Sequence, residues 1–144
     1  MRMNYRQIPP EGLQKFLDFY GYLKSTTLPQ ELLHMLFLRI SQMNGCPYCV
    51  DLHWKDAVKA GVDVRKLNGL VTWRDMPFFN DKEKAVFAWV EEVTRLHGRQ
   101  VAEAKLDALK PHFTEKEIVD LTFAAAHMNA LNRIAIAFHA VPAA

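Results

Sequence analysis

Residues 44–53 of this 144-residue chain read Asn-Gly-Cys-Pro-Tyr-Cys-Val-Asp-Leu-His, and this stretch decides the fold. Asn-Gly is typical of a helix end, whereas Cys46-Pro47 is typical of a helix start, because proline is favoured in the first turn. Two helices joined by so short a turn fold back on each other. We therefore expect a helical hairpin with Cys46 and Cys49 on the first turn of its second helix.

Apolar residues recur at helical spacing on both sides of this hairpin. Thr114 and Glu117 have the spacing of a capping box, which marks a helix start. The expected helices cover residues 10–24, 29–43, 46–60, 63–71, 101–109 and 114–140. A further helix is expected to begin at residue 80 or 81, after a loop over 72–80, and to end at Gly98. No segment alternates like a strand. The sequence predicts an all-α fold, a single-domain helical bundle over residues 1–144.

The composition excludes several classes of partner. The formal net charge is +2, and the 18 lysines and arginines are scattered among acidic residues. A nucleic-acid or anionic-membrane partner usually needs a clustered basic face. The N-terminus has no apolar core of a signal peptide, and no uninterrupted apolar stretch approaches the ~20 residues of a membrane span. We expect a cytoplasmic protein with no nucleic-acid or membrane partner.

The two cysteines have the spacing of a reactive thiol pair. On one helix, Cys46, Cys49 and His53 stand at i, i+3 and i+7 and share a face. The helix N-terminus lowers the pKa of a nearby thiol, and an imidazole in contact with the sulfur takes up its proton. Helix position favours Cys46 as the nucleophile, whereas reach to the base favours Cys49, since seven residues span about 10 Å. We expect Cys49 to attack.

A second histidine lies at a similar depth in the hairpin. His34 precedes Gly45 by eleven residues, and His53 follows it by eight, so the two rings can meet across the paired helices. A half-buried histidine with a structural role explains the spacing of His34 at least as well. Asp56, three residues after His53, either orients that ring or belongs to a solvated face.

Other uses of these residues stay open. Both cysteines can be inert core residues, or they can bind zinc with His53 and with His34 as a fourth ligand, although no second Cys/His pair appears. A c-type haem site is excluded, because Val50 follows the second cysteine. In the apolar last helix, Asn129, Asn132 and Arg133 line a pocket, form a subunit contact or bond internally, and internal bonding is favoured.

Residues 39–53 resemble the core motif of the AhpD-like alkylhydroperoxidases, within the carboxymuconolactone decarboxylase superfamily. The likeness extends to residues 55–57, 59–61, 77–79 and 129–135. The resemblance implies an all-α fold, homo-oligomers and peroxide reduction by a thiol pair. It also implies that Cys49 is the peroxidatic cysteine, Cys46 the resolving cysteine and His53 the motif histidine.

The chain departs from this family at two positions. The family often has a glutamate proton relay twelve residues before the first cysteine, where this chain has His34. Members with the fullest relay also have a histidine just before the second cysteine, where this chain has Tyr48. We therefore take His34 as the candidate relay residue, beside Cys46, Cys49 and His53 as candidate catalytic residues.

The sequence thus predicts a thiol-dependent peroxidase. Its expected partners are a small hydroperoxide substrate and an unidentified dithiol reductant, and it requires no metal or other cofactor. The alternative is a non-peroxidatic redox-sensing or zinc-binding oligomeric protein. Half of the residues are hydrophobic, and Trp54, Trp73, Trp89 and residues 78–79 are spread over short helices, which together with the resemblance predicts a homo-oligomer.

Overall fold

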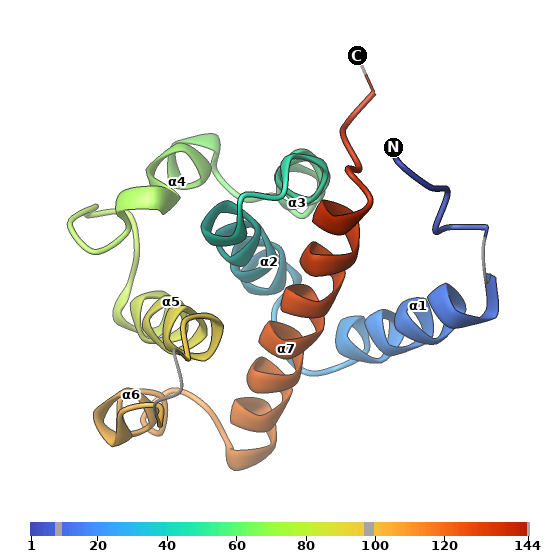
Figure 1. Ribbon diagram of the computed structural model, residues 1–144. Helices are drawn as coiled ribbons and strands as arrows, with labels where there is room; N and C mark the ends of the chain where they lie inside the picture. Colours follow the sequence, from blue (N-terminus) through green and yellow to red (C-terminus); the bar gives the residue numbers. More distant parts are fainter. Residues whose placement is uncertain (8–9, 97–99, 144) are drawn as a thin grey trace.

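The computed structural model describes residues 1–7, 10–96 and 100–143, and every regular element in these ranges is a helix (Figure 1). The all-α prediction is confirmed. The elements are α1 (Pro10–Lys24), α2 (Gln30–Asn44), α3 (Pro47–Lys59), α4 (Val64–Gly69), the 3-10 turn η1 (Leu70–Thr72), α5 (Asp81–Thr94), α6 (Glu103–Asp107) and α7 (Glu115–Ala137).

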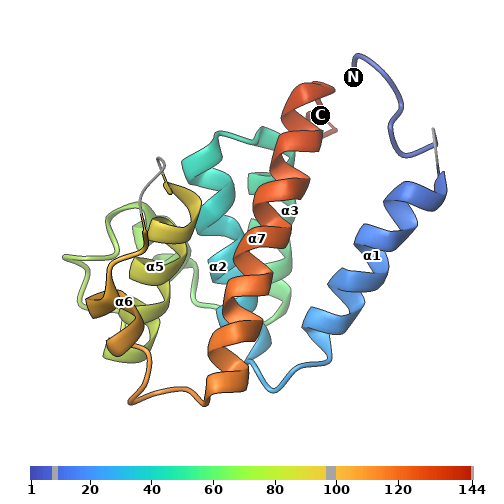
Figure 2. The ribbon, with the colours of Figure 1, turned by 60° about the horizontal axis from the view of Figure 1, so that its bottom comes forward.

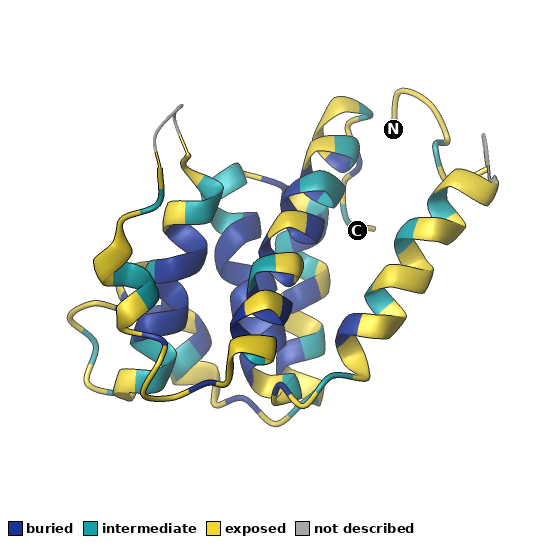
Figure 3. Cartoon of the chain, turned by 90° about the horizontal axis from the view of Figure 1, so that it is seen from below, coloured by how far each residue is buried: buried dark blue, intermediate teal, exposed yellow. Residues whose placement is uncertain are grey.

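Helix α2 lies at the centre of the molecule, where α3, α5 and α7 pack around it (Figure 1). Every residue from Leu32 to Ser41 is buried, and Figure 3 shows this unbroken burial in dark blue. A helix that is apolar around most of its circumference requires neighbours on several sides, which accounts for its central position. The helix consequently brings His34 and Arg39 into the interior along with the apolar residues.

Helix α1 stands apart from the other helices and contacts mainly α7 (Figure 2). Its Phe16, Phe19 and Tyr20 rings surround the buried His127 of α7, with centroid distances of 5.9, 5.3 and 6.2 Å. Most of its other residues are exposed (Figure 3). The N- and C-terminal segments lie on the same side of the molecule, because the amide of Arg2 donates to the carbonyl of Phe138 at 2.7 Å.

The turn between α2 and α3 follows the sequence prediction. Gly45 adopts the left-handed conformation, with φ 67° and ψ 38°. The amide of Gly45 donates to Gln42, and the amide of Cys46 donates to Ser41 at 3.1 Å, so the last carbonyls of α2 are satisfied. Glycine takes this conformation without a steric penalty, and the chain reverses within two residues.

The helix starts predicted at residue 80 or 81 and at Thr114 are also confirmed. Asn80 caps α5 and Thr114 caps α7, each in a complete capping box with Glu83 and Glu117. Helix α5 ends at Thr94, whereas its expected terminator, Gly98, lies outside the described residues.

Three helix ends differ from the prediction. The segment 63–71 divides into α4 and η1, and α6 is shorter than residues 101–109. Helix α7 ends at Ala137 rather than at residue 140, because His139 turns to a φ of 56° and the amide of Ala140 donates back to Ala135 at 2.8 Å. Within the described ranges, no helix is long and apolar enough to cross a membrane.

One buried carboxylate connects three separate segments. Glu91 of α5 accepts hydrogen bonds from Arg39 Nε of α2 at 2.7 Å and from Trp73 Nε1 at 2.9 Å, and it also pairs with Arg74. Burial alone would raise the pKa of Glu91, but the hydrogen bonds from Trp73, Arg74 and Arg39 outweigh it and lower the pKa. Glu91 therefore stays ionised in the core and ties α2 to α5.

We expect Glu91→Gln to lower the free energy of unfolding by about 3 kcal/mol at neutral pH, because it leaves Arg39 buried without its counter-ion. A folded-state pKa below the ordinary value gives stability that is present above pH 4.5 and is lost as the pH falls through the folded pKa. The deficit of the variant should therefore shrink in acid. Denaturant unfolding at a series of pH values measures both effects.

The exposed neighbour Glu92 provides the matched control. Glu92→Gln should change the stability by less than about 0.5 kcal/mol at every pH. Equal stabilities of the Glu91→Gln and Glu92→Gln proteins at neutral pH would show that the buried pair contributes nothing net.

Candidate active site

The cysteine pair lies where the sequence predicts, at the N-terminus of α3. Cys46 is the N-cap residue in an extended conformation, and Pro47 begins the helix. The Cys46 sulfur accepts a hydrogen bond from the Cys49 amide at 3.3 Å, and the two residues form a disulfide with a Cα–Cα distance of 5.3 Å. Cys46 therefore precedes the helix instead of occupying its first turn, but it remains within bonding distance of Cys49.

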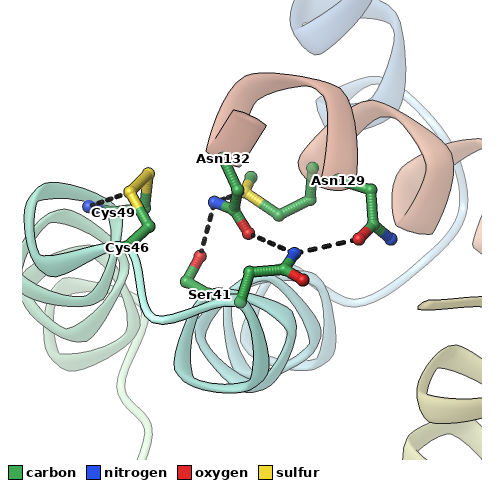
Figure 4. The surroundings of a disulfide bond; sticks show 7 residues. Ser41, Cys46, Cys49, Asn129 and Asn132 are labelled. Atoms are coloured by element: carbon green, nitrogen blue, oxygen red, sulfur yellow. Dashed lines mark hydrogen bonds between the residues drawn. A yellow bond between two sulfur atoms is a disulfide. The ribbon is translucent and has the colours of Figure 1, made fainter. Parts of the chain in front are cut away.

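A network of buried amides holds the disulfide region against α7 (Figure 4). Asn44 Nδ2 donates to Asn129 Oδ1 and Asn132 Oδ1, each at 2.9 Å, and Asn132 Nδ2 donates to Ser41 Oγ at 3.1 Å. Arg133 donates to the carbonyl of Asn129 at 3.0 Å. The prediction that these polar residues bond internally is confirmed, and they fix the end of α2 that leads into Cys46.

A cavity of about 250 Å³ opens on one side of the disulfide, between α1, α3 and α7. Its walls are largely apolar, and Cys49 and His53 are two of the residues that line it. The lining residues are Tyr5, Arg6, Leu13, Leu17, Tyr48, Cys49, Leu52, His53, Met128, Leu131 and Ala135. Cys46 is not among them, because its side chain is fully buried whereas Cys49 is 5% exposed.

The N-terminal segment covers part of this cavity. The Tyr5 ring stacks on Phe138 with a centroid distance of 5.6 Å, and the Arg6 guanidinium lies 4.5 Å from the centre of the Tyr48 ring. No sequence pattern marks Tyr5 and Arg6 as site residues, because they belong to no periodic element and their partners are remote in the sequence. Tyr48, which stands where family members with the fullest relay have a histidine, also lines the cavity.

The structure brings His34 and His53 together across the α2–α3 hairpin, as their similar distances in sequence from Gly45 predict. Both are buried, their ring centroids are 6.3 Å apart, and the Phe37 ring lies 5.1 Å from His53. Among the described residues, no group hydrogen-bonds to Nδ1 of either ring. Asp56 completes the cluster: one ligand atom from each of His34, His53 and Asp56 lies within 4.8 Å of the others.

Both imidazoles are neutral at neutral pH. Burial lowers the pKa of His53 to about 3, with smaller contributions from His34 and His127. Burial also lowers the pKa of His34, although the charge of Asp56 opposes it. His53 is therefore a proton acceptor rather than a standing cation, and an imidazolium forms there only if a negative charge such as a thiolate develops beside it.

The structure also bears on the predicted zinc ligands. The cysteines are joined to each other, and the group of potential ligands found within the described ranges is His34, His53 and Asp56. In this disulfide form, the four residues Cys46, Cys49, His53 and His34 therefore do not form a ligand set.

Residues 10–92 match the carboxymuconolactone decarboxylase family. The uncharacterized protein YdfG of Bacillus subtilis is 32% identical over 94% of this chain and 92% of its own length. The chain therefore belongs to the carboxymuconolactone decarboxylase family, as the motif around Cys46 and Cys49 predicted.

Solved structures agree. A protein of unknown function from Agrobacterium tumefaciens, named as a candidate antioxidant defence protein AhpD, shares 32% identity and a TM-score of 0.94 over 99% of both chains. An uncharacterized peroxidase-related protein with an alkylhydroperoxidase AhpD core, from Ralstonia eutropha, has a TM-score of 0.86 at 20% identity, over 96% of this chain and 74% of that chain. The second likeness shows the fold alone. The fold is AhpD-like.

Proposed function

We propose that this protein is a thiol-dependent peroxidase that reduces small organic hydroperoxides through the Cys46–Cys49 pair. The observation that carries the proposal is that Cys49 and His53 line one apolar cavity while Cys49 is bonded to Cys46 behind it. Membership of a family with AhpD-like structures supports the same chemistry. Apolar walls suit the alkyl part of an organic hydroperoxide.

The proposed cycle begins at Cys49. Its thiolate attacks the terminal oxygen of the hydroperoxide, the O–O bond breaks, and the leaving alkoxide takes up a proton from His53 as the alcohol. The Cys46 thiol then attacks the sulfenic acid on Cys49, which forms the disulfide and releases water. The peroxide gains the two electrons that the thiols lose, and an external dithiol resets the pair by becoming a disulfide itself.

Access and reach both favour Cys49 as the peroxidatic cysteine. Cys49 lines the cavity, whereas Cys46 is fully buried. His53 follows Cys49 by four residues on α3, the spacing of side chains that meet on one helix face. Cys46 is suited to the resolving role, because it lies within bonding distance of Cys49 without facing the cavity.

The proposed base is the neutral His53 imidazole, which takes the Cys49 proton. Because burial makes the imidazolium unfavourable, His53 holds the proton only while the thiolate charge is beside it and readily gives it to the leaving alkoxide. We assign His34 as the residue that exchanges this proton onward, since its ring is the neighbouring imidazole. The thiols carry both electrons, so the cycle uses no metal, haem or flavin, and we assign it to the cytoplasm, where dithiol reductants are maintained.

We expect Cys46→Ser to consume a single equivalent of peroxide and to stop at a sulfenic acid on Cys49, because the resolving thiol is absent. Cys49→Ser should react only at the background rate of an ordinary thiol. Stopped-flow peroxide consumption with sulfenic-acid trapping and peptide mass analysis measures both. The reverse pattern, with sulfenic acid on Cys46 of the Cys49→Ser protein at the wild-type rate, would exchange the two roles. Slow, unsaturable turnover by the wild type would favour a redox sensor.

We expect His34→Gln to slow peroxide reduction by at least about tenfold and to shift its pH profile, because the amide cannot pass on a proton. His34→Glu, which introduces the residue common in the family, should restore the rate. Circular dichroism checks that both variants fold. Identical rates and pH profiles for wild type, Gln and Glu would show that His34 is structural.

We also propose that the chain forms a homo-oligomer through α1 and α7. Three of the aromatic residues behind the sequence prediction cannot contribute to an interface, because Trp73, Trp89 and Phe79 are buried in this chain. Trp54 is 38% exposed. Exposed aromatic rings gather elsewhere: Phe19 lies 6.0 Å from Phe123, and both are more than a third exposed. An exposed apolar patch of this kind marks an interaction site.

Light scattering at micromolar concentration should therefore give a multiple of the 16.6 kDa chain mass. Phe123→Lys should shift the protein toward the monomer, because it introduces a charge into the buried interface. Val71→Lys, which changes an apolar residue of similar exposure outside this patch, is the control and should leave the mass unchanged. A wild-type mass equal to that of a single chain would refute the assembly.

A further inference from the structure

Three potential metal ligands converge in the α2–α3 hairpin. His34 comes from α2, and His53 and Asp56 stand three residues apart on the facing side of α3. One ligand atom from each side chain lies within 4.8 Å of the other two. The same reversal at Gly45 that positions the cysteines thus assembles a group of two imidazoles and one carboxylate.

One ring nitrogen of each histidine lacks the partner that a buried polar group normally has. Nδ1 of His34 and Nδ1 of His53 are buried without a hydrogen bond, and His53 is only 4% exposed. Asp56 is only partly buried, and the side-chain hydrogen bonds and salt bridges found within the described ranges do not involve its carboxylate. Since leaving a buried donor or acceptor unsatisfied costs about 1–3 kcal/mol, the two histidines call for a partner.

We propose that His34, His53 and Asp56 bind a divalent transition-metal ion, with zinc as the best match. Two ligand atoms of one tetrahedral zinc ion lie about 3.4 Å apart, because each bond is about 2.0–2.2 Å long. The ligand atoms of this cluster lie within 4.8 Å of one another, so movements of about 0.7 Å by each atom close the cluster around an ion. Two histidines and one carboxylate are a known zinc set that leaves a further position for water.

The surroundings favour a transition metal over magnesium or calcium. Neutral imidazoles are the ligating form of histidine, and they suit zinc, copper, iron and nickel, whereas magnesium and calcium select oxygen ligands. The Phe37 ring, 5.1 Å from His53, forms an apolar wall that strengthens the attraction between Asp56 and a cation. Two other charges act on this group: the Lys24 ammonium disfavours the binding of a cation, and the Glu31 carboxylate favours it.

Metal binding has a direct consequence for the thiols, which rests on the proposed function. A metal ion on His53 occupies the imidazole that accepts the Cys49 proton. Zinc should therefore slow peroxide reduction, and a chelator should restore it. The site contains no cysteine, so it persists when the disulfide forms.

The test uses the full-length chain, treated with a chelator and fully oxidised, and titrates it with Co²⁺ as a spectroscopic substitute for Zn²⁺. We expect a single equivalent to bind, with visible cobalt absorption but no sulfur-to-cobalt charge-transfer band. Zn²⁺ should displace it, and Mg²⁺ should not. His34→Gln and Asp56→Asn should each weaken binding by more than the ~10–100-fold that loss of an outer-shell partner costs.

Asp51→Asn is the matched control, because Asp51 lies on the same helix and pairs with Lys55 at 2.7 Å. It should bind Co²⁺ like the wild type. If His34→Gln fails to fold, Asp56→Asn alone tests the site, because Asp56 is only partly buried and its substitution disturbs the fold less. Absence of Co²⁺ binding, binding that appears only after reduction with a charge-transfer band, or binding unchanged in both ligand variants overturns the proposal. Peroxide reduction by metal-free protein is measured separately, so an inactive protein that still binds Co²⁺ contradicts the peroxidase alone.

Discussion

The left-handed turn at Gly45 is the constraint on which the rest of the site depends. By reversing the chain within two residues, it makes Cys46 the N-cap of α3 and lays α3 antiparallel along α2. It also sets the register of the two helices, so that His34 faces His53. Any residue with a side chain is strained at this φ, so the position requires glycine. A longer turn would separate the cysteines from the amide network and the two histidines from each other.

Two kinds of buried polar group follow from this arrangement. The amides of Asn129 and Asn132 and the carboxylate of Glu91 have their hydrogen bonds satisfied, and they fix α2 against α7 and α5. Nδ1 of His34 and Nδ1 of His53 lack partners within the described ranges. Satisfied groups hold a structure in one state, whereas unsatisfied ones remain able to exchange a proton or to bind a ligand. The satisfied groups named here thus belong to contacts of α2 with α7 and α5, whereas the two unsatisfied nitrogens lie inside the α2–α3 hairpin.

Local patterns predicted the features that depend on neighbours in the sequence. The end of α2, the start of α3 and the capping box at Thr114 are local. The meeting of His34 with His53 follows from counting residues from the turn at Gly45. The remaining features depend on packing between remote segments. Arg39 meets Glu91 across 52 residues, and Tyr5 stacks on Phe138 at the far end of the chain, so no periodicity marks either pair. The early end of α7 likewise depends on the backbone conformation at a single residue, His139.

The hydrogen bond from the Cys49 amide to the Cys46 sulfur has a consequence for thiol–disulfide exchange. In the cycle that we propose, an external thiolate that enters through the cavity attacks the sulfur of Cys49, so Cys46 is the leaving group. A leaving thiolate departs faster when its negative charge is stabilised, and here it is received by a backbone N–H at the positive end of α3. In that cycle, the helix terminus that aligns the pair therefore also speeds the departure of the Cys46 thiolate.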